Sequence, residues 1–351
     1  MGRQNKKYHR DLKQQVYDRL TPMLKAGEGT SRKAAKADGS ERYKIFSYST
    51  YETYRKHCNY FCDYVREYHP ECTTIKKAEK YMSEWLQRRV DQVDMNGKHL
   101  SAWTIQTEAK ALGKLYGITQ EDPHYFHPPQ RKREDIVRSR GDKVRDKHFS
   151  EKNNDELVKF CRGTGCRRNV LERLRGRDLV TRGELEKEYE ELKVKEDKGM
   201  LGEGENARLQ ALKDVEEHFK GQDYFIHHRG DKGGRERFAP IVGPNKEQIV
   251  ERMRNTAPDE KVWQHVSGNA DIHGYRGDYA TFIYRAYARP IEEIPYDKEN
   301  KGTKKLYQKD VYVCRKDEKG KKLDKKAMTI ASKALGHNRL EVVANNYIRG
   351  L

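Results

Sequence analysis

A tyrosine close to the C-terminus, Tyr347, follows a Leu-Gly-His sequence at 335–337 and a short run with helical spacing. A phenol there can act on a phosphate only if the chain also supplies cationic groups and a proton donor. Upstream segments supply both kinds of side chain. They are Thr-Gly-Cys-Arg at 164–167, Asp-Lys-Gly-Gly-Arg-Glu-Arg-Phe-Ala-Pro at 231–240, and His-Gly-Tyr-Arg at 273–276.

These residue types fit metal-free cleavage of a phosphodiester. That reaction needs an oxygen nucleophile, neutralisation of the charge on the pentacoordinate phosphorus, and a proton for the departing 5′ oxygen. Arg167 and Arg276 suit the second task, because a guanidinium offers parallel N–H donors and stays charged at any working pH. The spacing of three puts His273 and Arg276 on one side of the first turn of a predicted helix, where an anion is favoured. A phenol with a pKa of about 10 needs such help at pH 7.

In this order the segments resemble the motifs of the tyrosine recombinase (phage integrase) family, as found on bacterial mobile elements. The resemblance assigns six catalytic residues: Arg167, Lys232, His273, Arg276, His337 and Tyr347. It implies that Tyr347 is the nucleophile, that the two arginines hold the phosphate, and that Lys232 is the general acid. It further implies that His337 hydrogen-bonds the phosphate and that His273 accepts the tyrosine proton or orients the site. Arg168 is expected to be a bystander, and the sequence departs from most relatives at Tyr275 and Gly277.

The resemblance implies a site-specific DNA recombinase or integrase that cuts and rejoins strands through a covalent 3′-phosphotyrosine, without metal, ATP or other cofactor. The implied partners are double-stranded DNA, further copies of the chain in a tetramer, and accessory excision or DNA-bending proteins. Two alternatives stay open: a catalytically silent DNA-binding protein on the same scaffold, and strand relaxation like that of a type IB topoisomerase. A metal-dependent nuclease is disfavoured, because no carboxylate cluster accompanies the histidines.

Composition agrees with a polyanionic partner. The chain has 73 Lys and Arg against 55 Asp and Glu, a net charge of +18, which favours nucleic acid over an acidic membrane. The six cysteines form no Cys-x-x-Cys pair, and His57, Cys58 and Cys62 lack a second pair of ligands for zinc. No apolar run approaches the roughly 18 residues of a membrane span, and the first residues are too polar for a secretory signal. A bacterial cytoplasmic location, on the nucleoid when DNA is bound, is therefore predicted.

The elements that must position these residues are predicted to be mainly α-helical with a small antiparallel β-sheet, in a two-domain, C-shaped DNA clamp. A basic N-terminal arm (1–45), with one helix from residue 11 to 24 and an irregular stretch after it, is expected to precede a helical core-binding domain (46–127). Apolar residues at helical spacing predict three helices there, beginning near residues 49, 75 and 101. A basic linker (128–148) follows. The predicted DNA contacts are Arg131, Lys132, Arg133, Arg138 and Arg140 in the linker, with Arg235 and Arg237 further on.

The catalytic domain is expected to occupy 149–351 and to contain two insertions. The segment 181–220 has 8 Lys and Arg against 12 Asp and Glu, a net charge of −4, and reads as an acidic αα-hairpin facing away from DNA. Its removal is expected to spare cleavage of a single strand. The segment 289–327 is a polar insertion with a strand at 311–314 and Asp324 as the cap of the next helix. A β-hairpin formed by 224–226 and 237–242 is predicted to carry Lys232 at its tip.

Overall fold

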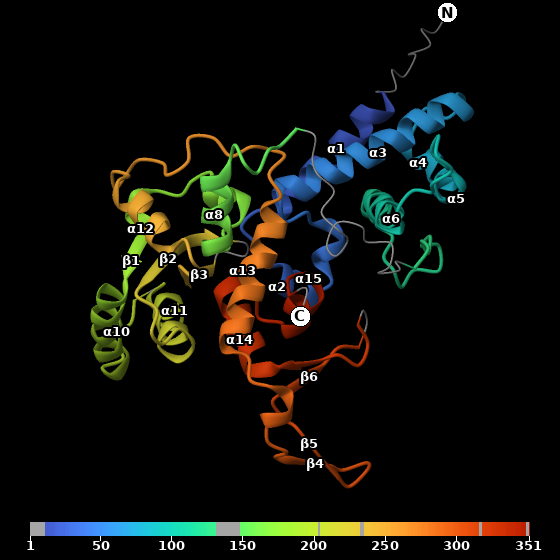
Figure 1. The fold of residues 1–351 in the computed structure, drawn as a ribbon. Coiled ribbons are helices and arrows are strands. Elements are labelled where there is room, and N and C mark those ends of the chain that lie inside the picture. The colour runs from blue at the N-terminus through green and yellow to red at the C-terminus, as the bar shows by residue number, and fades with distance from the viewer. Residues whose placement is uncertain (1–10, 131–147, 203, 232–234, 316–317, 349–350) are drawn as a thin grey trace, which may run out of the picture. The chain divides into compact units, whose positions relative to one another are not determined.

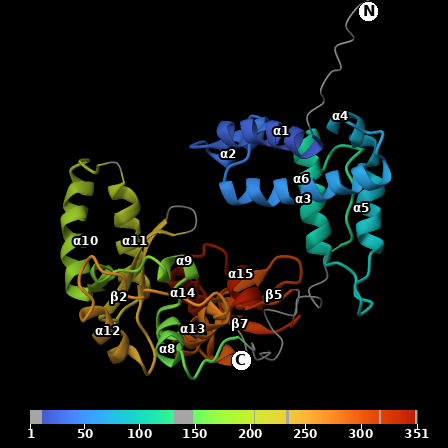
Figure 2. The same cartoon turned by 90° about the horizontal axis from the view of Figure 1, so that it is seen from above.

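In the computed structural model the chain divides into two compact units, 1–135 and 136–351. The structure describes residues 11–130, 148–202, 204–231, 235–315, 318–348 and 351, without the side chains of residues 230, 231 and 235. Within that part the protein is mainly helical with small antiparallel sheets, as predicted. Figures 1 and 2 show the elements in two views.

The first unit is all helical. Its elements are α1 (Leu12–Gly27), α2 (Arg32–Ala37), η1 (Ser40–Tyr43), α3 (Tyr48–Tyr68), α4 (Ile75–Ala78), η2 (Glu79–Tyr81), α5 (Met82–Asp91) and α6 (Ala102–Tyr116). The predicted helices are present, but the second is divided into α4, η2 and α5. Ser101 caps α6 by accepting from the Thr104 N–H, and Gly97 forms the preceding turn with φ +72°.

The N-terminal segment differs from the predicted separate arm. Leu12, Val16 and Leu20 on α1 are buried in the same cluster as residues of α3, and Ile45 joins them. Residues 25–42, expected to be irregular, contain α2 and η1. The difference arises because charged side chains dominate the composition of 1–45, while three apolar residues at a spacing of four suffice to give α1 a buried face.

The second unit contains the predicted motifs. Its helical elements are α8 (Asp155–Thr164), α9 (Arg168–Leu171), η3 (Gly176–Asp178), α10 (Arg182–Asp197), α11 (Glu205–His218), α12 (Lys246–Arg254), α13 (Ile272–Tyr287), η4 (Ile291–Glu293), α14 (Lys325–Leu335) and α15 (Leu340–Asn346). Its strands are β1 (Leu179–Thr181), β2 (Tyr224–Asp231), β3 (Arg235–Pro240), β4 (Lys298–Asn300), β5 (Lys305–Tyr307), β6 (Val311–Val313) and β7 (Lys322–Asp324). Asp324 caps α14 as predicted, by accepting from the Lys326 N–H at 2.8 Å.

The strands form three small antiparallel sheets. The largest has the order β1-β2-β3, so the predicted β2–β3 hairpin is joined by a strand that the sequence analysis did not predict. Only three residues, 179–181, make up β1, and they pair with 224–226 across the α10–α11 hairpin. A run of three residues is too short to show the alternation of apolar and polar residues by which a strand is predicted.

The predicted αα-hairpin is present, and Figure 2 shows α10 and α11 lying side by side. Thr181 begins α10 in a capping box with Glu184. The hairpin packs against the unit that carries the motifs, because Leu185, Leu209 and Leu212 belong to one buried cluster with Leu335 and Tyr347. The 181–220 segment is therefore part of the core of this unit, which changes the expectation that it can be removed without consequence.

Candidate active site

Tyr347 lies at the C-terminal end of α15 and is 6 % exposed. Its N–H donates to the Val343 carbonyl at 3.0 Å, which continues the helical pattern by one residue. Its hydroxyl lies 3.1 Å from Nε2 of His337. The ring of His273 is also near, with its centroid 5.0 Å from that of Tyr347. Two imidazoles therefore lie beside the predicted nucleophile.

His337 owes its position to the end of α14. Gly336 terminates the helix with φ +70°, a conformation that favours glycine, and a Cβ there would lie 2.7 Å from Cδ of Arg237. The His337 N–H then donates to the Ser332 carbonyl at 2.8 Å, and the Ser332 hydroxyl donates back to the His337 carbonyl at 2.8 Å. The Leu-Gly-His motif thus forms a helix end that fixes the imidazole.

Arg276 is on the first turns of α13 and is 2 % exposed. Its two terminal nitrogens donate to the carbonyls of Gly165 and Leu335, so it joins the first and last motifs. Burial, and after it the neighbouring Arg237 and Arg167, lower the pKa of Arg276 to about 10, which leaves it charged at neutral pH. Its Nε is buried without a hydrogen-bond partner among the described residues, and its guanidinium carbon lies 5.5 Å from the centre of the Tyr347 ring.

Arg167 and Arg168 have different surroundings. Arg168 donates to the carbonyls of Ser267 at 2.6 Å, Ala270 at 2.8 Å and Gly268 at 3.1 Å, and so fixes the loop that leads into α13. Arg168 also lines the pocket described below, and its bystander role stays a prediction. Arg167 is half-buried at the start of α9 and faces the same pocket as Arg276.

That pocket brings together four of the six predicted catalytic residues. Its volume is about 320 Å³. It is lined by Arg167, Arg168, Ala270, Asp271, Ile272, His273, Arg276 and Tyr347. Among these lining residues Asp271 is the single carboxylate, and it accepts the Gly274 N–H at 2.9 Å as the cap of α13. A small pocket with charged guanidiniums and a helix N-terminus favours an anion of phosphate size.

Two further residues of the site were not predicted as such. His228 and Arg237 are directly opposite each other on β2 and β3, and both side chains are buried. Arg237 donates to the Ala334 carbonyl, and its other terminal nitrogen lies 3.1 Å from Nδ1 of His228. Burial, followed by Arg237, Arg276 and Arg167, holds the pKa of His228 well below its usual value, so the imidazole is neutral and accepts from Arg237.

The position of Arg237 corrects its predicted role as an exposed DNA contact. Its guanidinium is buried and packs beneath Gly336, where it supports the helix end that carries His337. Alternation along the strands gives no signal for this burial, because residues 225–228 and 237–240 are all buried and both faces of β2 and β3 are covered there.

Several predicted residues cannot be placed. Lys232, the predicted general acid, lies outside the described residues, and the side chain of Arg235 is not described. The predicted linker contacts also lie outside the described residues: Arg131, Lys132, Arg133, Arg138 and Arg140. Their roles stay predictions.

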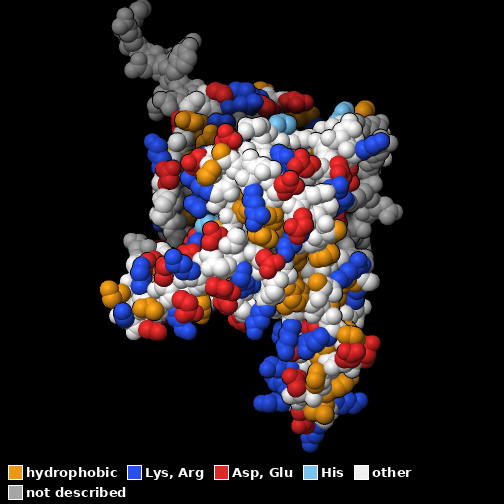
Figure 3. Space-filling view, turned by 60° about the vertical axis from the view of Figure 1, so that its left-hand side comes forward, with side chains coloured by type: hydrophobic (Ala, Val, Ile, Leu, Met, Phe, Trp, Pro, Cys, Tyr) orange, Lys and Arg blue, Asp and Glu red, His pale blue; other side chains and the backbone are white. Residues whose placement is uncertain are grey.

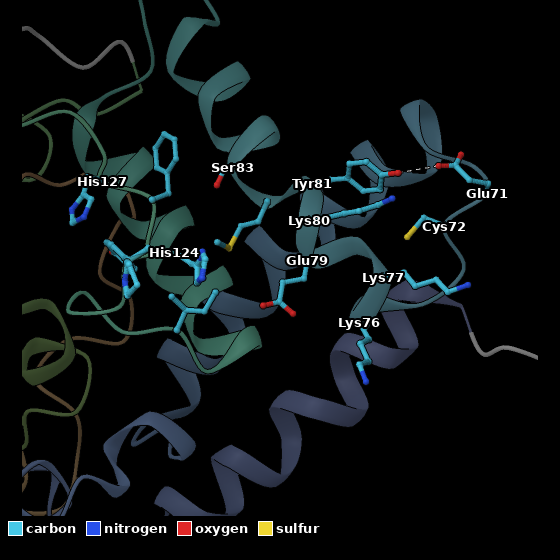
Figure 4. Close-up of a pocket in the computed structure, with 15 residues that line it drawn as sticks. Glu71, Cys72, Lys76, Lys77, Glu79, Lys80, Tyr81, Ser83, His124 and His127 are labelled. Atoms are coloured by element: carbon cyan, nitrogen blue, oxygen red, sulfur yellow. Dashed lines mark hydrogen bonds between the residues drawn. The ribbon is translucent and has the colours of Figure 1, made fainter.

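A larger pocket, of about 1120 Å³, lies in the helical unit, far along the chain from the motifs. Figure 4 shows Lys76, Lys77 and Lys80 around it, with the Tyr81 hydroxyl donating to Glu71 at 3.1 Å. Lysines, glutamates and histidines are mixed along its wall, so no single ligand charge is favoured. It contains none of the predicted catalytic residues.

No protein-family model and no curated protein matches the chain. Within the described residues no group of three or more His, Cys, Asp or Glu side chains is arranged to hold a metal ion. Among the described helices, none combines the length and apolar character that a membrane crossing requires.

Proposed function

We propose that this protein is a tyrosine recombinase, which cuts and rejoins DNA strands through Tyr347. The observation that carries the proposal is the contact of 3.1 Å between the Tyr347 hydroxyl and Nε2 of His337, beside the pocket lined by Arg167 and Arg276. A nucleophile, a base and cations for one phosphate are thereby within reach of one another.

In the proposed reaction the Tyr347 oxygen attacks the scissile phosphorus and forms a 3′-phosphotyrosine bond. The resemblance implied that His273 accepts the phenol proton or orients the site, but the contact of 3.1 Å to the Tyr347 hydroxyl supports His337 as the acceptor, with His273 beside it as the second imidazole. Arg167 and Arg276 neutralise the charge of the pentacoordinate transition state. The bond from phosphorus to the 5′ oxygen breaks, and Lys232 supplies the proton that makes the leaving group a hydroxyl. Attack by the 5′ hydroxyl of another strand reverses these steps and joins the two DNAs.

The proposal includes the arrangement of the protein on DNA. One Tyr347 cuts one strand, so exchange between two duplexes needs four copies, which supports a tetramer. A clamp of two domains around duplex DNA is supported by the two units, the basic segment 128–148 and the net charge of +18. Each phosphate contacted steepens the dependence of log affinity on log salt by about 0.9, so a clamp predicts a slope steeper than about −3. Accessory proteins that bend DNA or favour excision belong to the same proposal.

The deciding experiment uses nicked duplexes that trap the covalent intermediate, drawn from a panel of candidate sites. Wild-type protein should give a protein–DNA band on denaturing gels, and Tyr347→Phe should give none while still binding DNA. Absence of the band from wild type on every duplex would favour a silent DNA-binding protein. A covalent band with relaxation of supercoils and no strand exchange would favour topoisomerase activity instead.

A second arm tests the general acid. A thiol has a pKa of about 8.5, so a 5′ thiolate can leave without a proton donor, whereas a 5′ alkoxide needs a proton as it leaves. Replacing the bridging 5′ oxygen with sulfur should restore cleavage by Lys232→Ala, do nothing for Tyr347→Phe, and do little for Arg167→Ala. Rescue of Arg235→Ala in place of Lys232→Ala would move the general acid to residue 235.

A further inference from the structure

The second unit carries a projecting two-stranded ribbon that the proposed chemistry does not use. We name residues 296–309 the basic ribbon; it contains β4, β5 and the turn between them. Residues 296–307 are all exposed, including Tyr296 and Leu306 at 61 % and 62 %. In Figure 1 β4 and β5 extend away from the helices of this unit, and Figure 3 shows Lys and Arg side chains gathered over the projecting lobe.

The ribbon has five lysines and two carboxylates, a net charge of +3. Its register separates these charges. Lys298 is opposite Tyr307 and Asn300 is opposite Lys305, so these four side chains share one face. Glu299 and Leu306 are opposite each other on the other face. Lys301 and Lys304 lie in the connecting turn, so one face and the tip are basic.

The lysines of the ribbon have no internal partners that would explain them. Within the described residues, the lysines at 298, 301, 304, 305 and 309 make no ion pair. The α10–α11 hairpin has lysines of both kinds, since Lys195 and Lys213 lie 2.6 Å and 2.7 Å from glutamate oxygens, whereas the exposed Lys187 and Lys193 make no ion pair within the described residues. Positive charge on the ribbon is therefore available to a partner.

The base of the ribbon is held firmly. Gln308 is 9 % exposed, and its amide donates to the carbonyls of Ile291 at 2.7 Å and Ile294 at 2.6 Å. The Lys309 N–H donates to a carboxylate oxygen of Asp297 at 2.8 Å, which closes the two ends of the ribbon. The ribbon is therefore anchored at its base, while its lysines on the strands and in the turn are exposed.

We infer that the basic ribbon binds the phosphate backbone of duplex DNA at a second position, away from the cleaved bond. The inference rests on the proposed function for its partner, and DNA matches both the charge and the shape, because a two-stranded ribbon fits the major groove. The ribbon follows the C-terminal end of α13, and Arg276 lies near the N-terminal end. From Arg276 to the end of α13 at Tyr287 the helix rises about 16 Å, the length of about 5 base pairs of DNA.

A charge-matched pair of variants tests this inference. The ribbon variant carries Lys→Ala at Lys298, Lys301, Lys304 and Lys305. The control carries Lys→Ala at the exposed Lys187, Lys193, Lys198 and Lys220 of the 181–220 segment. Both lose four positive charges, so a difference between them reports position and not net charge. Both are made in Tyr347→Phe protein, so that binding is measured without cleavage.

The probes are random-sequence duplexes of 16 and 40 base pairs, with affinity measured by fluorescence anisotropy over a range of salt. On the long duplex the ribbon variant should lose about 0.9 from the salt slope for each phosphate contact removed, and so as much as about 3.6. The parent protein should bind the 40-base-pair duplex more tightly than the 16-base-pair duplex. This difference in affinity should shrink in the ribbon variant, and in the control it should equal that of the parent. A fourth protein, with Lys→Arg at the same ribbon positions in the Tyr347→Phe background, should keep the parent slope.

Equal slopes for the ribbon variant and the control would overturn the inference. A loss of self-association in the ribbon variant, seen by sedimentation with no change in DNA slope, would also overturn it and assign the ribbon to an acidic surface of a neighbouring copy. Failure of the proposed function is a separate result, since it is judged by the covalent band of the wild-type protein and not by these slopes.

Discussion

The α10–α11 hairpin carries an excess of carboxylates, whereas the basic ribbon carries an excess of lysines. The hairpin buries leucines from both helices in the core that contains Tyr347, and its charged residues pair with one another and with the neighbouring strands. The ribbon is exposed on both faces and is attached through the buried Gln308 at its base. These two highly charged segments thus differ in use: the hairpin is part of the core that contains Tyr347, and the ribbon is an exposed surface.

The network around Arg208 shows how the hairpin supports the site. Arg208 on α11 donates to both carboxylate oxygens of Glu188 at 2.6 Å and to Glu236 on β3 at 2.7 Å. Glu236 also lies 2.6 Å from Nε2 of His227, and the guanidinium covers the Phe238 ring at 4.4 Å. The hairpin therefore holds the two strands from which the predicted Lys232 turn extends.

The largest expected effect is that of deletion. Removing 183–219 with a short Gly/Ser bridge should abolish cooperative unfolding of the second unit, because it exposes the cluster that contains Leu335 and Tyr347. Removing 298–307 in the same way should leave a cooperative transition, since that segment is exposed throughout. Calorimetry of both deletions is the measurement. If the hairpin deletion melts like the wild type, the hairpin is not needed for the core of the second unit, and the proposed difference between hairpin and ribbon is wrong.

Single leucines should show the same difference on a smaller scale. Leu212 is 1 % exposed, so Leu212→Ala should lower the free energy of unfolding by about 2–5 kcal/mol. Leu306 is 62 % exposed, so Leu306→Ala should change it by less than about 0.5 kcal/mol. Urea denaturation of the two variants gives the comparison. Similar losses for both would mean that the ribbon packs against something in solution.

Removing the Arg208 side chain should have an intermediate effect. Arg208→Ala leaves Glu188 and Glu236 without their shared cation and should cost about 1–3 kcal/mol. Lys298→Ala in the ribbon is the control and should cost less than about 0.5 kcal/mol. Adding Glu188→Gln to Arg208→Ala completes a double-mutant cycle, and a coupling energy near zero would contradict the role given to the pair.

The smallest effect concerns pH. The hydrogen bond with His227, and then the charge of Arg208, lower the pKa of Glu236. Stability from this carboxylate is therefore fully present above the unfolded pKa of about 4.3 and is lost as pH falls through the lower folded value. Glu236 is 28 % exposed, so the contribution should stay below about 1 kcal/mol.

The check is the stability of Glu236→Gln from pH 6 down to pH 3, which should fall less steeply than that of the wild type. Glu299→Gln on the ribbon is the matched control and should follow the wild-type profile. A steeper fall for Glu236→Gln would show that the carboxylate does not stabilise the folded state through this network.

The sequence by itself determined the local features of this protein. Asp324 caps a helix where predicted, and Ser101 caps the helix predicted to begin near residue 101, because a side-chain oxygen satisfies the first free N–H groups of whatever helix follows. The α10–α11 hairpin follows from helical periodicity around glycines with positive φ. The resemblance of the motifs to those of tyrosine recombinases likewise assigned Arg167, His273, Arg276 and Tyr347 to one site, and these four residues line one pocket.

Only the tertiary structure decided which arginine side chains hydrogen-bond backbone carbonyls inside the protein. Arg237 and Arg168 are arginines like many others in a chain with 73 basic residues, and their roles depend on carbonyls of Ala334 and Ser267 that are about 100 residues away. The pairing of β1 with β2 and the burial of the acidic hairpin depend on equally distant contacts. Propensity and periodicity depend on the residues adjacent along the chain. Burial and pairing depend on residues that are adjacent only in the folded structure, so local patterns could not predict them.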